Sequence, residues 1–164
     1  TRNAYKNFDR LIIAFSQVAE CHKDLLLVCT GGDFNALEMK LLQQYGVEDR
    51  VVHLFASESD VKNLYAFAKV FIYPSLYEGF GMPIIEANAT GRVLLTSKIT
   101  SIPEIAANTA HYINPYDVSS IRKGFQKLIS DDKYREKLIL RGIANAKRFT
   151  IKHITEEYEN IYNS

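Results

Sequence analysis

Short apolar runs alternate with amphipathic segments over residues 7–113. Five of these runs have the length of buried strands: 25–30, 51–55, 70–73, 93–96 and 110–113. Between them, apolar residues recur three or four positions apart, the spacing of one helix face, and a first helix is predicted over about 7–22. Strands that alternate with helices favour a parallel sheet covered on both faces. The predicted fold class is therefore α/β, a Rossmann-like three-layer α/β/α sandwich with a parallel sheet.

The last part of the chain has no strand-like runs. Three further helices are predicted there, over about 118–130, 132–148 and 151–162. Earlier in the chain, Gly46 and Gly91 are placed to end helices. Ser59 is predicted to cap the helix after the second strand, and Ser101 with Glu104 has the spacing of a capping box.

A glycine loop joins the strand at 70–73 to the helix that follows it. Gly79 and Gly81 lie in this loop, and Pro83 suits the first helical position because it lacks an N–H group. Glycines let backbone N–H groups approach a bulky anion, and the positive end of a helix favours negative charge. The loop therefore predicts a phosphate-binding site at the start of this helix.

Two carboxylates flank the glycines. Glu78 lies in the loop, and Glu86 lies about one turn inside the helix. A carboxylate accepts hydrogen bonds from neighbouring hydroxyls of a sugar or a ribose. A phosphate site between two groups that bind polyols describes a site for a nucleotide sugar. Taken alone, Glu78 could equally cap the helix start, and Glu86 could be a paired helical residue.

The segment 74–87 has the form Pro-Ser-x-x-Glu-Gly-Phe-Gly-x-Pro-x-x-Glu-Ala. In this form it resembles the retaining glycosyltransferases of family 4, which have the GT-B architecture and are marked by two Glu separated by seven residues. Glu78 and Glu86 stand at those two positions, and a weaker similarity extends over nearly the whole chain. The resemblance implies that residues 1–164 are the C-terminal, donor-binding half of a GT-B fold. It also implies transfer of a hexosyl group from a UDP- or GDP-sugar to an acceptor hydroxyl.

The resemblance assigns roles to the motif residues. Glu78 is implied to contact hydroxyls of the transferred sugar, and Glu86 is implied to contact those of the ribose. The backbone N–H groups implied to hold the phosphates are those of Gly79, Phe80, Gly81 and Met82. The leaving phosphate is implied to assist deprotonation of the acceptor, so neither a metal nor a cofactor is expected.

Two cations and two further loops complete the implied site. Arg2 and Lys6 match positions where the family places an Arg and a Lys on the donor diphosphate. Fixed cations stabilise the negative charge that develops on a leaving diphosphate. Gly31 is expected to line the cleft at the carboxyl end of its strand, and Ser57 and Glu58 align with the loop that contacts the base. The implied catalytic residues are Arg2, Lys6 and Glu78.

The chain departs from the family pattern at three places. Phe55-Ala56 stands where the family usually has Leu-Gly, which leaves the identity of the base open. Phe149-Thr150 is not followed by the usual Trp. The first recognisable element is a helix, whereas the family has a strand just ahead of Thr1. We therefore expect a longer enzyme whose N-terminal half binds an acceptor glycan or a lipid-linked glycan.

Composition restricts the classes of partner. The formal net charge of +1 gives no support to a nucleic-acid surface. No apolar run approaches the roughly 20 residues needed to span a bilayer. Cys21 and Cys29 are interpreted as reduced thiols in or near the core, as in a cytoplasmic protein. Any association with the inner membrane is expected to involve the N-terminal half.

Other interpretations remain beside the transferase. The chain could be a nucleotide-sugar-binding module without catalysis, or a relative that acts as a GT-B epimerase or phosphorylase. A NAD-binding domain is disfavoured because Gly79-Phe80-Gly81 is not followed by the third glycine of Gly-x-Gly-x-x-Gly. The four histidines lie far apart and lack metal-ligand spacing, so they predict no metal centre.

Overall fold

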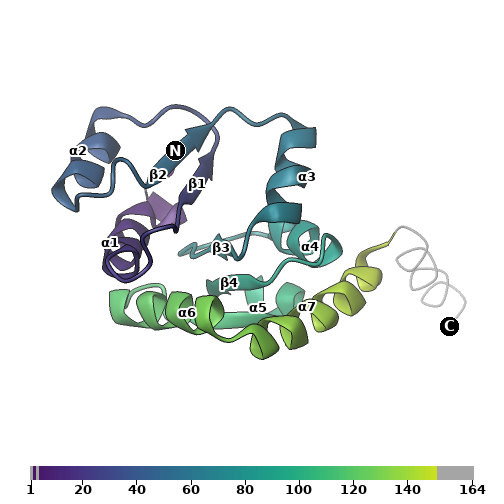
Figure 1. The fold of residues 1–164 in the computed structure, drawn as a ribbon. Helices are drawn as coiled ribbons and strands as arrows, with labels where there is room; N and C mark the ends of the chain where they lie inside the picture. Colours follow the sequence, from purple (N-terminus) through teal and green to yellow (C-terminus); the bar gives the residue numbers. More distant parts are fainter. Residues whose placement is uncertain (1, 3, 151–164) are drawn as a thin grey trace, which may run out of the picture.

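Parallel strands with helices on both faces form the body of the protein (Figure 1). The computed structural model describes residue 2 and residues 4–150. The strands are β1 (Leu27–Thr30), β2 (Val51–Leu54), β3 (Phe71–Tyr73), β4 (Leu94–Ser97) and β5 (Ala110–Ile113). The helices are η1 (Ala4–Lys6), α1 (Phe8–Ala19), α2 (Ala36–Gln44), α3 (Glu58–Phe67), α4 (Met82–Ala89), α5 (Ile102–Ala106), α6 (Val118–Ser130), α7 (Asp132–Ala146) and η2 (Lys147–Phe149).

The strands form two parallel sheets. In the first sheet β1 pairs with β2, and Leu27 lies opposite Val51. In the second sheet the order is β3-β4-β5, and Tyr73 lies opposite Thr96. The predicted alternation of strands and helices is thus confirmed, and so is the parallel direction of the strands.

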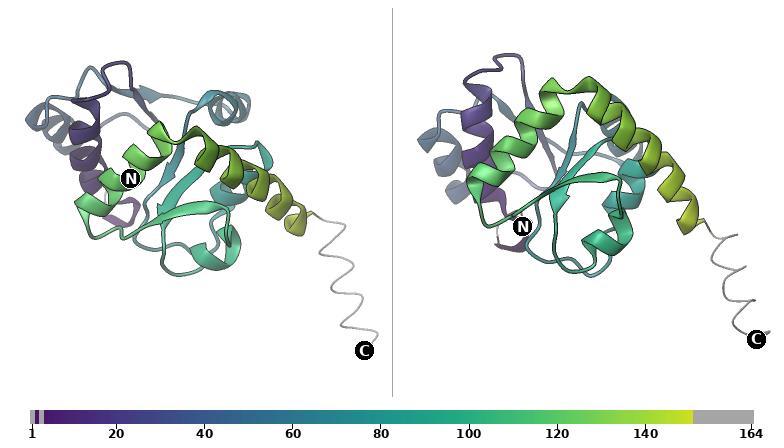
Figure 2. Two further views of the ribbon diagram at one scale, coloured as in Figure 1. Left: turned by 60° about the horizontal axis from the view of Figure 1, so that its bottom comes forward. Right: turned by 90° about the horizontal axis from the view of Figure 1, so that it is seen from below.

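Helices cover both faces of the second sheet. Leu94 belongs to an apolar cluster with residues of α4 and α5, whereas Leu95 packs on the other face with residues of α1 and α6. Both leucines are fully buried. Figure 2 shows α6 and α7 crossing this second face, with α1 beside α6. The predicted three-layer arrangement is therefore present around β3, β4 and β5.

A glycine on α6 allows the helix to lie close to this sheet. A Cβ atom at Gly124 would stand 2.6 Å from Cδ1 of Leu95 and 2.9 Å from Cγ2 of Ile113. Distances below about 3 Å leave no room for a side chain in a close-packed interior. The absence of a side chain at Gly124 thus sets the spacing between α6 and the sheet.

An opening separates the two sheets. Strands β1 and β3 are not paired with each other, and a cavity of about 1370 Å³ lies between them. Apolar side chains of α3, among them Val61 and Leu64, line the cavity together with Phe15 of α1 and Phe125 of α6. The space is therefore bounded by two strands and by apolar side chains of helices.

The sequence interpretation is wrong about two helix caps and one cysteine. Ser57, not Ser59, caps α3, because Ser57 has an acidic residue at the third position of the helix: its hydroxyl accepts from Asp60 N, and Asp60 Oδ2 accepts from Ser57 N at 2.9 Å. Ser101 makes no side-chain cap bond, because its backbone is helical and its hydroxyl donates elsewhere. Cys21 is exposed rather than near the core, whereas Cys29 is partly buried.

The remaining element boundaries agree closely with the prediction. Strand β5 and helix α6 cover the predicted residues, and Gly91 has the left-handed backbone (φ 67°) expected just beyond the end of α4. Pro83 is the second rather than the first residue of α4. The predicted helix at 151–162 lies outside the described residues.

Candidate active site

The loops at the carboxyl ends of the strands gather around the start of α4. The loop after β3 carries Glu78, whose backbone N–H donates to Thr100 Oγ1 at 3.3 Å and whose carbonyl accepts from Ser101 Oγ at 3.1 Å. Thr100 and Ser101 lie in the loop after β4. In open parallel sheets, this is the edge at which ligands bind. The glycine loop is thus fixed against its neighbour at that edge.

The turn into α4 requires a glycine. Gly81 has φ of 93°, a left-handed conformation that disfavours other residues, and it is the N-cap of α4. A Cβ atom there would lie 3.0 Å from Cδ1 of Ile84. Because Gly81 has no side chain, no side-chain cap occupies the positive end of this helix. The start of α4 therefore has no side-chain cap at the place where the N–H groups of Gly79, Phe80, Gly81 and Met82 are predicted to hold a phosphate.

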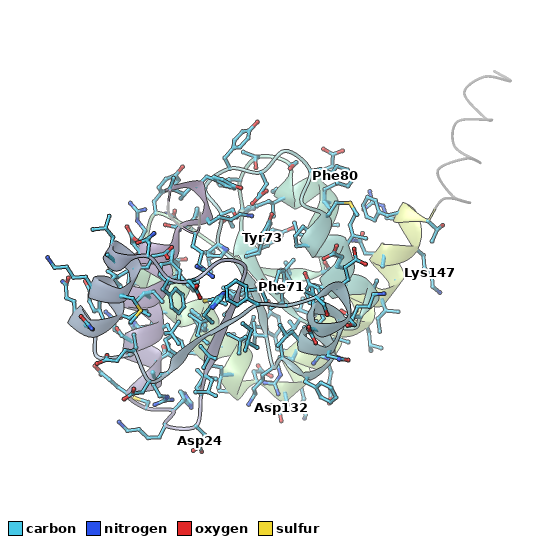
Figure 3. The ribbon with its side chains drawn as sticks, turned by 90° about the horizontal axis from the view of Figure 1, so that it is seen from above. Asp24, Phe71, Tyr73, Phe80, Asp132 and Lys147 are labelled. Carbon is cyan, nitrogen blue, oxygen red and sulfur yellow. The ribbon has the colours of Figure 1, made fainter. Side chains whose placement is uncertain are left out.

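Glu78 has two partners from other segments. Lys6 Nζ of η1 lies 3.4 Å from Glu78 Oε1, and the Glu78 side chain is 12% exposed. The phenol of Tyr73 is the second: its pKa is raised, first by burial and then by its interaction with the Glu78 carboxylate. Tyr73 lies beside Phe71 on β3, near the centre of the view in Figure 3. The Tyr73 phenol thus stays protonated and neutral beside the Glu78 carboxylate.

Glu86 is exposed on α4 and lines the large cavity. The hydroxyl of Tyr65 donates to Glu86 Oε2 at 3.1 Å. Burial raises the pKa of Tyr65, and the charge of Glu86 raises it further, so this group is a donor at neutral pH. The side chain of Glu86 is thus held at one oxygen.

Arg2 lies at the end of β1, where its side chain contacts several groups. Its guanidinium donates to the carbonyl oxygens of Thr30 and Gly32, lies 3.6 Å from Glu38 Oε2, and stacks 4.8 Å from the ring centre of Phe34. None of its contacts among residues 2 and 4–150 is with Glu78. The structure therefore places the two predicted cations at different positions, although both line the large cavity.

The predicted base loop forms a second, smaller hollow. It has a volume of about 380 Å³ and is lined by Gly31, Gly32, Phe55, Ala56 and Ser57. The Phe55 side chain is 72% exposed, and its ring stands edge-on 4.6 Å from the ring of His53. The hydroxyl of Ser57 is already engaged with Asp60, whereas Glu58 begins α3. The structure thus brings Gly31 and Ser57 together, as expected of one cleft.

The residues that surround the two carboxylates were not predicted from the sequence. Tyr65, Tyr73, Thr100 and Ser101 all touch a predicted carboxylate or its backbone. In the sequence, Tyr65 fits an apolar helix face and Tyr73 fits the strand at 70–73. Both are aromatic residues with a polar tip, which usually finds a partner when buried. This preference is the feature of the sequence that could have indicated hydrogen-bonding roles for the two tyrosines.

Neither a metal centre nor a membrane-spanning helix is present in the part of the chain that the structure describes. No group of three or more His, Cys, Asp or Glu is arranged to hold a metal ion there. No helix among the same residues is long and apolar enough to cross a bilayer.

The protein is similar to known glycosyltransferases in fold and in sequence. The fold is the Rossmann-like α/β fold found in GT-B glycosyltransferases: the C-terminal domain of a Francisella tularensis glycosyl transferase group 1 family protein superposes with a TM-score of 0.77 over 88% of this chain and 80% of that chain, at 22% identity. A structure of S. aureus TarM in complex with UDP superposes with a TM-score of 0.84 over 98% of this chain and 34% of that chain, at 18% identity. Residues 2–144 match the family of glycosyl transferases group 1, and the chain belongs to that family.

A relative of known activity is similar in sequence. O-antigen chain mannosyltransferase B of Escherichia coli is 38% identical over 108 residues, which are 66% of this chain and 28% of the relative. The chain therefore spans less than a third of that protein. The predicted membership of a glycosyltransferase family is confirmed, and so is the predicted fold class.

Proposed function

We propose that the chain is the C-terminal, donor-binding domain of a retaining glycosyltransferase that moves a hexosyl group from a UDP- or GDP-sugar to an acceptor hydroxyl. The observation that carries this proposal is the pair formed by Lys6 and Glu78 at the glycine loop. Lys6 also lines the cavity that Glu86 lines. A cation, two carboxylates and an uncapped helix start are thus gathered at one edge of the sheet.

Each group has a part in the proposed site. The N–H groups at the start of α4 hold the diphosphate, and Lys6 stabilises the charge that develops on it as the sugar leaves. Arg2 holds the turn after β1 and adds positive charge at the same edge. Glu78 accepts from hydroxyls of the sugar and Glu86 from those of the ribose, because a carboxylate is a pure acceptor. The proposal requires no metal and no cofactor.

The proposal also covers where the base binds and which sugar is transferred. The hollow between Gly31 and Ser57 receives the base, with Phe55 and Glu58 at its edge. Several relatives are named as mannosyltransferases, and these names favour mannose as the transferred hexose. The complex of TarM with UDP keeps a uridine donor among the candidates.

A strand ahead of Thr1 is part of the proposal. Such a strand would fill the opening between β1 and β3, where it can pair with both. The start of the chain supports this place: Arg2 contacts the carbonyl of Thr30 at the end of β1, and the carbonyl of Tyr5 accepts from Leu76 N beyond β3. A chain that runs into residue 2 between these points would be parallel to both strands.

The N-terminal half is proposed to bind the acceptor, a glycan or a lipid-linked glycan. The longer relatives, of which this chain spans 14% to 42%, support the existence of such a half. The active site would then lie in the cleft between the halves, so this chain alone would transfer little sugar. The enzyme is proposed to be cytoplasmic, and any contact with the inner face of a membrane would be made by the N-terminal half.

A transfer assay on the full-length protein tests the proposed function. The protein would be incubated with UDP- and GDP-linked mannose and glucose and with glycan acceptors, and the anomeric configuration of the product would be read by NMR. Transfer with retained configuration is expected. Binding of a donor without turnover would favour the non-catalytic module, and an inverted product would overturn the retaining mechanism.

A further inference from the structure

Tyr65 is the one fully packed residue of α3. It is 7% exposed, whereas the remaining residues of this helix are exposed or half-buried. Its ring stands edge-on to the ring of Phe71 on β3, with 4.9 Å between the centres. The aromatic body of Tyr65 is thus fixed by packing, and with it the position of its hydroxyl.

The hydroxyl of Tyr65 has one good acceptor. Glu86 Oε2 lies 3.1 Å away, and the carbonyl oxygen of Pro83 lies 3.5 Å away, at the limit of a hydrogen bond. A phenol has a single proton to donate, and a charged acceptor makes the stronger bond. The Tyr65 hydroxyl therefore donates its hydrogen bond to Glu86.

The hydrogen bond from Tyr65 occupies only one oxygen of Glu86, so the other oxygen can accept a hydrogen bond from a ligand. The glutamate side chain is exposed on α4, and an exposed glutamate samples several rotamers unless a partner holds it. Fixing it before a ligand arrives reduces the entropy that binding would otherwise lose. Glu86 Oε1 makes no hydrogen bond with residues 2 and 4–150, so it can accept from the two hydroxyls of a ribose.

The same helix reaches the hollow proposed for the base. Helix α3 begins at Glu58, and its N-cap Ser57 lines that hollow, two turns before Tyr65. We propose that Tyr65 is a positioning residue, which orients the Glu86 carboxylate toward the ribose and couples it to the helix that borders the base. This inference rests on the proposed function, because it assigns Glu86 to the ribose.

The variant Tyr65→Phe tests the inference, because it keeps the ring against Phe71 and removes only the hydroxyl. In the full-length protein, calorimetry would measure the affinity for UDP, GDP and their 2′-deoxy and 3′-deoxy forms. We expect Tyr65→Phe to weaken ribonucleotide binding on the order of tenfold and to abolish the preference for ribose over deoxyribose. The double variant with Glu86→Ala should bind no more weakly than Glu86→Ala alone. In transfer assays, KM for the donor should rise while kcat stays within about twofold.

A second tyrosine supplies the matched control. Tyr134 of α7 also has a half-buried hydroxyl that is hydrogen-bonded, to His111 Nδ1 at 3.1 Å, and Tyr134→Phe should leave nucleotide affinity unchanged. Equal weakening of ribo- and deoxyribonucleotides by Tyr65→Phe would mean a purely structural role and would overturn the inference. Unchanged binding would also overturn it, and the proposed function would stand. Failure of the unmodified protein to bind any nucleotide would overturn both.

Discussion

Lys6 and Glu78 are 72 positions apart in the chain, yet Nζ of the lysine lies 3.4 Å from Oε1 of the glutamate. The contact joins the first helical turn to the glycine loop. Lys6 Nζ also lies 5.1 Å from the ring centre of Tyr73, whose pKa is raised by burial and by the same carboxylate. A cation is thus held beside the helix start that is proposed to bind the diphosphate.

Removal of this cation should affect the chemical step. In the full-length enzyme, Lys6→Ala is expected to lower kcat/KM at least about 100-fold, because a fixed charge on a leaving group acts in the transition state. Lys6→Arg should recover part of the activity. Lys123→Ala, at an exposed position of α6, is the matched control and should leave steady-state kinetics unchanged. Equal rates for the Lys6→Ala and Lys123→Ala variants would contradict the assignment of Lys6.

Substitutions at the two glycines of the loop distinguish the effect of backbone strain from the effect of blocking a ligand. Gly81→Ala should lower the free energy of unfolding by about 1–2 kcal/mol, because alanine is disfavoured at φ of 93° and its Cβ would press on Ile84. Gly79→Ala should change that free energy by less than about 0.5 kcal/mol, since a Cβ there meets no atom within 4 Å. Urea unfolding measures both.

The two glycine variants also differ in what binding would show. At Gly79 the added methyl group would occupy open space beside the proposed phosphate position, so Gly79→Ala should weaken nucleotide binding at little cost in stability. Full nucleotide affinity in Gly79→Ala would argue against a close approach of phosphate to this part of the loop.

The opening between β1 and β3 leads to a prediction about chain length. A protein that starts about 15 residues upstream of Thr1 in its natural sequence should unfold at higher urea concentration than the 164-residue chain, because a strand buried on both faces adds apolar contacts and backbone hydrogen bonds. It should also bind less of a dye that reports exposed apolar surface. A Gly-Ser extension of equal length is the control.

A substitution inside the opening sharpens this test. Leu64→Ser, on the face of α3 that lines the opening, should destabilise the extended protein more than the 164-residue chain. Leu140→Ser, at a leucine that is 69% exposed on α7, should affect both proteins equally. An equal loss from Leu64→Ser in both proteins would mean that the extension does not occupy the opening.

His111 should make stability depend on pH. Burial lowers the pKa of this histidine below its ordinary value of 6.5, and the positive charge of Lys127 lowers it further. As the pH falls through 6.5, the unfolded chain therefore takes up a proton before the folded protein does, and the free energy of unfolding decreases. His111→Gln should flatten this decline in urea titrations between pH 7 and pH 5. A decline of the same slope in the variant would assign it to other groups.

The sequence predicts elements where local pattern decides them. Helix α6 has apolar residues at regular helical spacing and an N-cap at Asp117, and its bounds agree with the prediction. The capping of α3 was misassigned although the signal is local: Ser57 with Asp60 completes a capping box, whereas Ser59 lies inside the helix. Ser101 fits the capping pattern, but its hydroxyl bonds to Glu78 instead, because the loop after β4 folds against the glycine loop.

The candidate site could be predicted only in part, because some of its contacts join elements that are far apart in the sequence. The motif identifies Glu78 and Glu86 because their spacing is a property of one short segment. The tyrosines that interact with these two carboxylates come from α3 and β3, and these interactions depend on how separate elements pack. The separation of the sheet into two parts also depends on strand pairing, which the order of apolar runs does not specify.

Calorimetric titration of the full-length protein with UDP, GDP and their mannose conjugates is the most direct test of the central claim. The account predicts saturable binding of one nucleotide series, weakened at least about tenfold by Lys6→Ala and by Glu86→Ala. Lys123→Ala and Glu136→Ala, at exposed positions of α6 and α7, should bind as the unmodified protein does. A folded protein that binds none of these nucleotides, or that binds one equally well in all four variants, would contradict the proposed donor site.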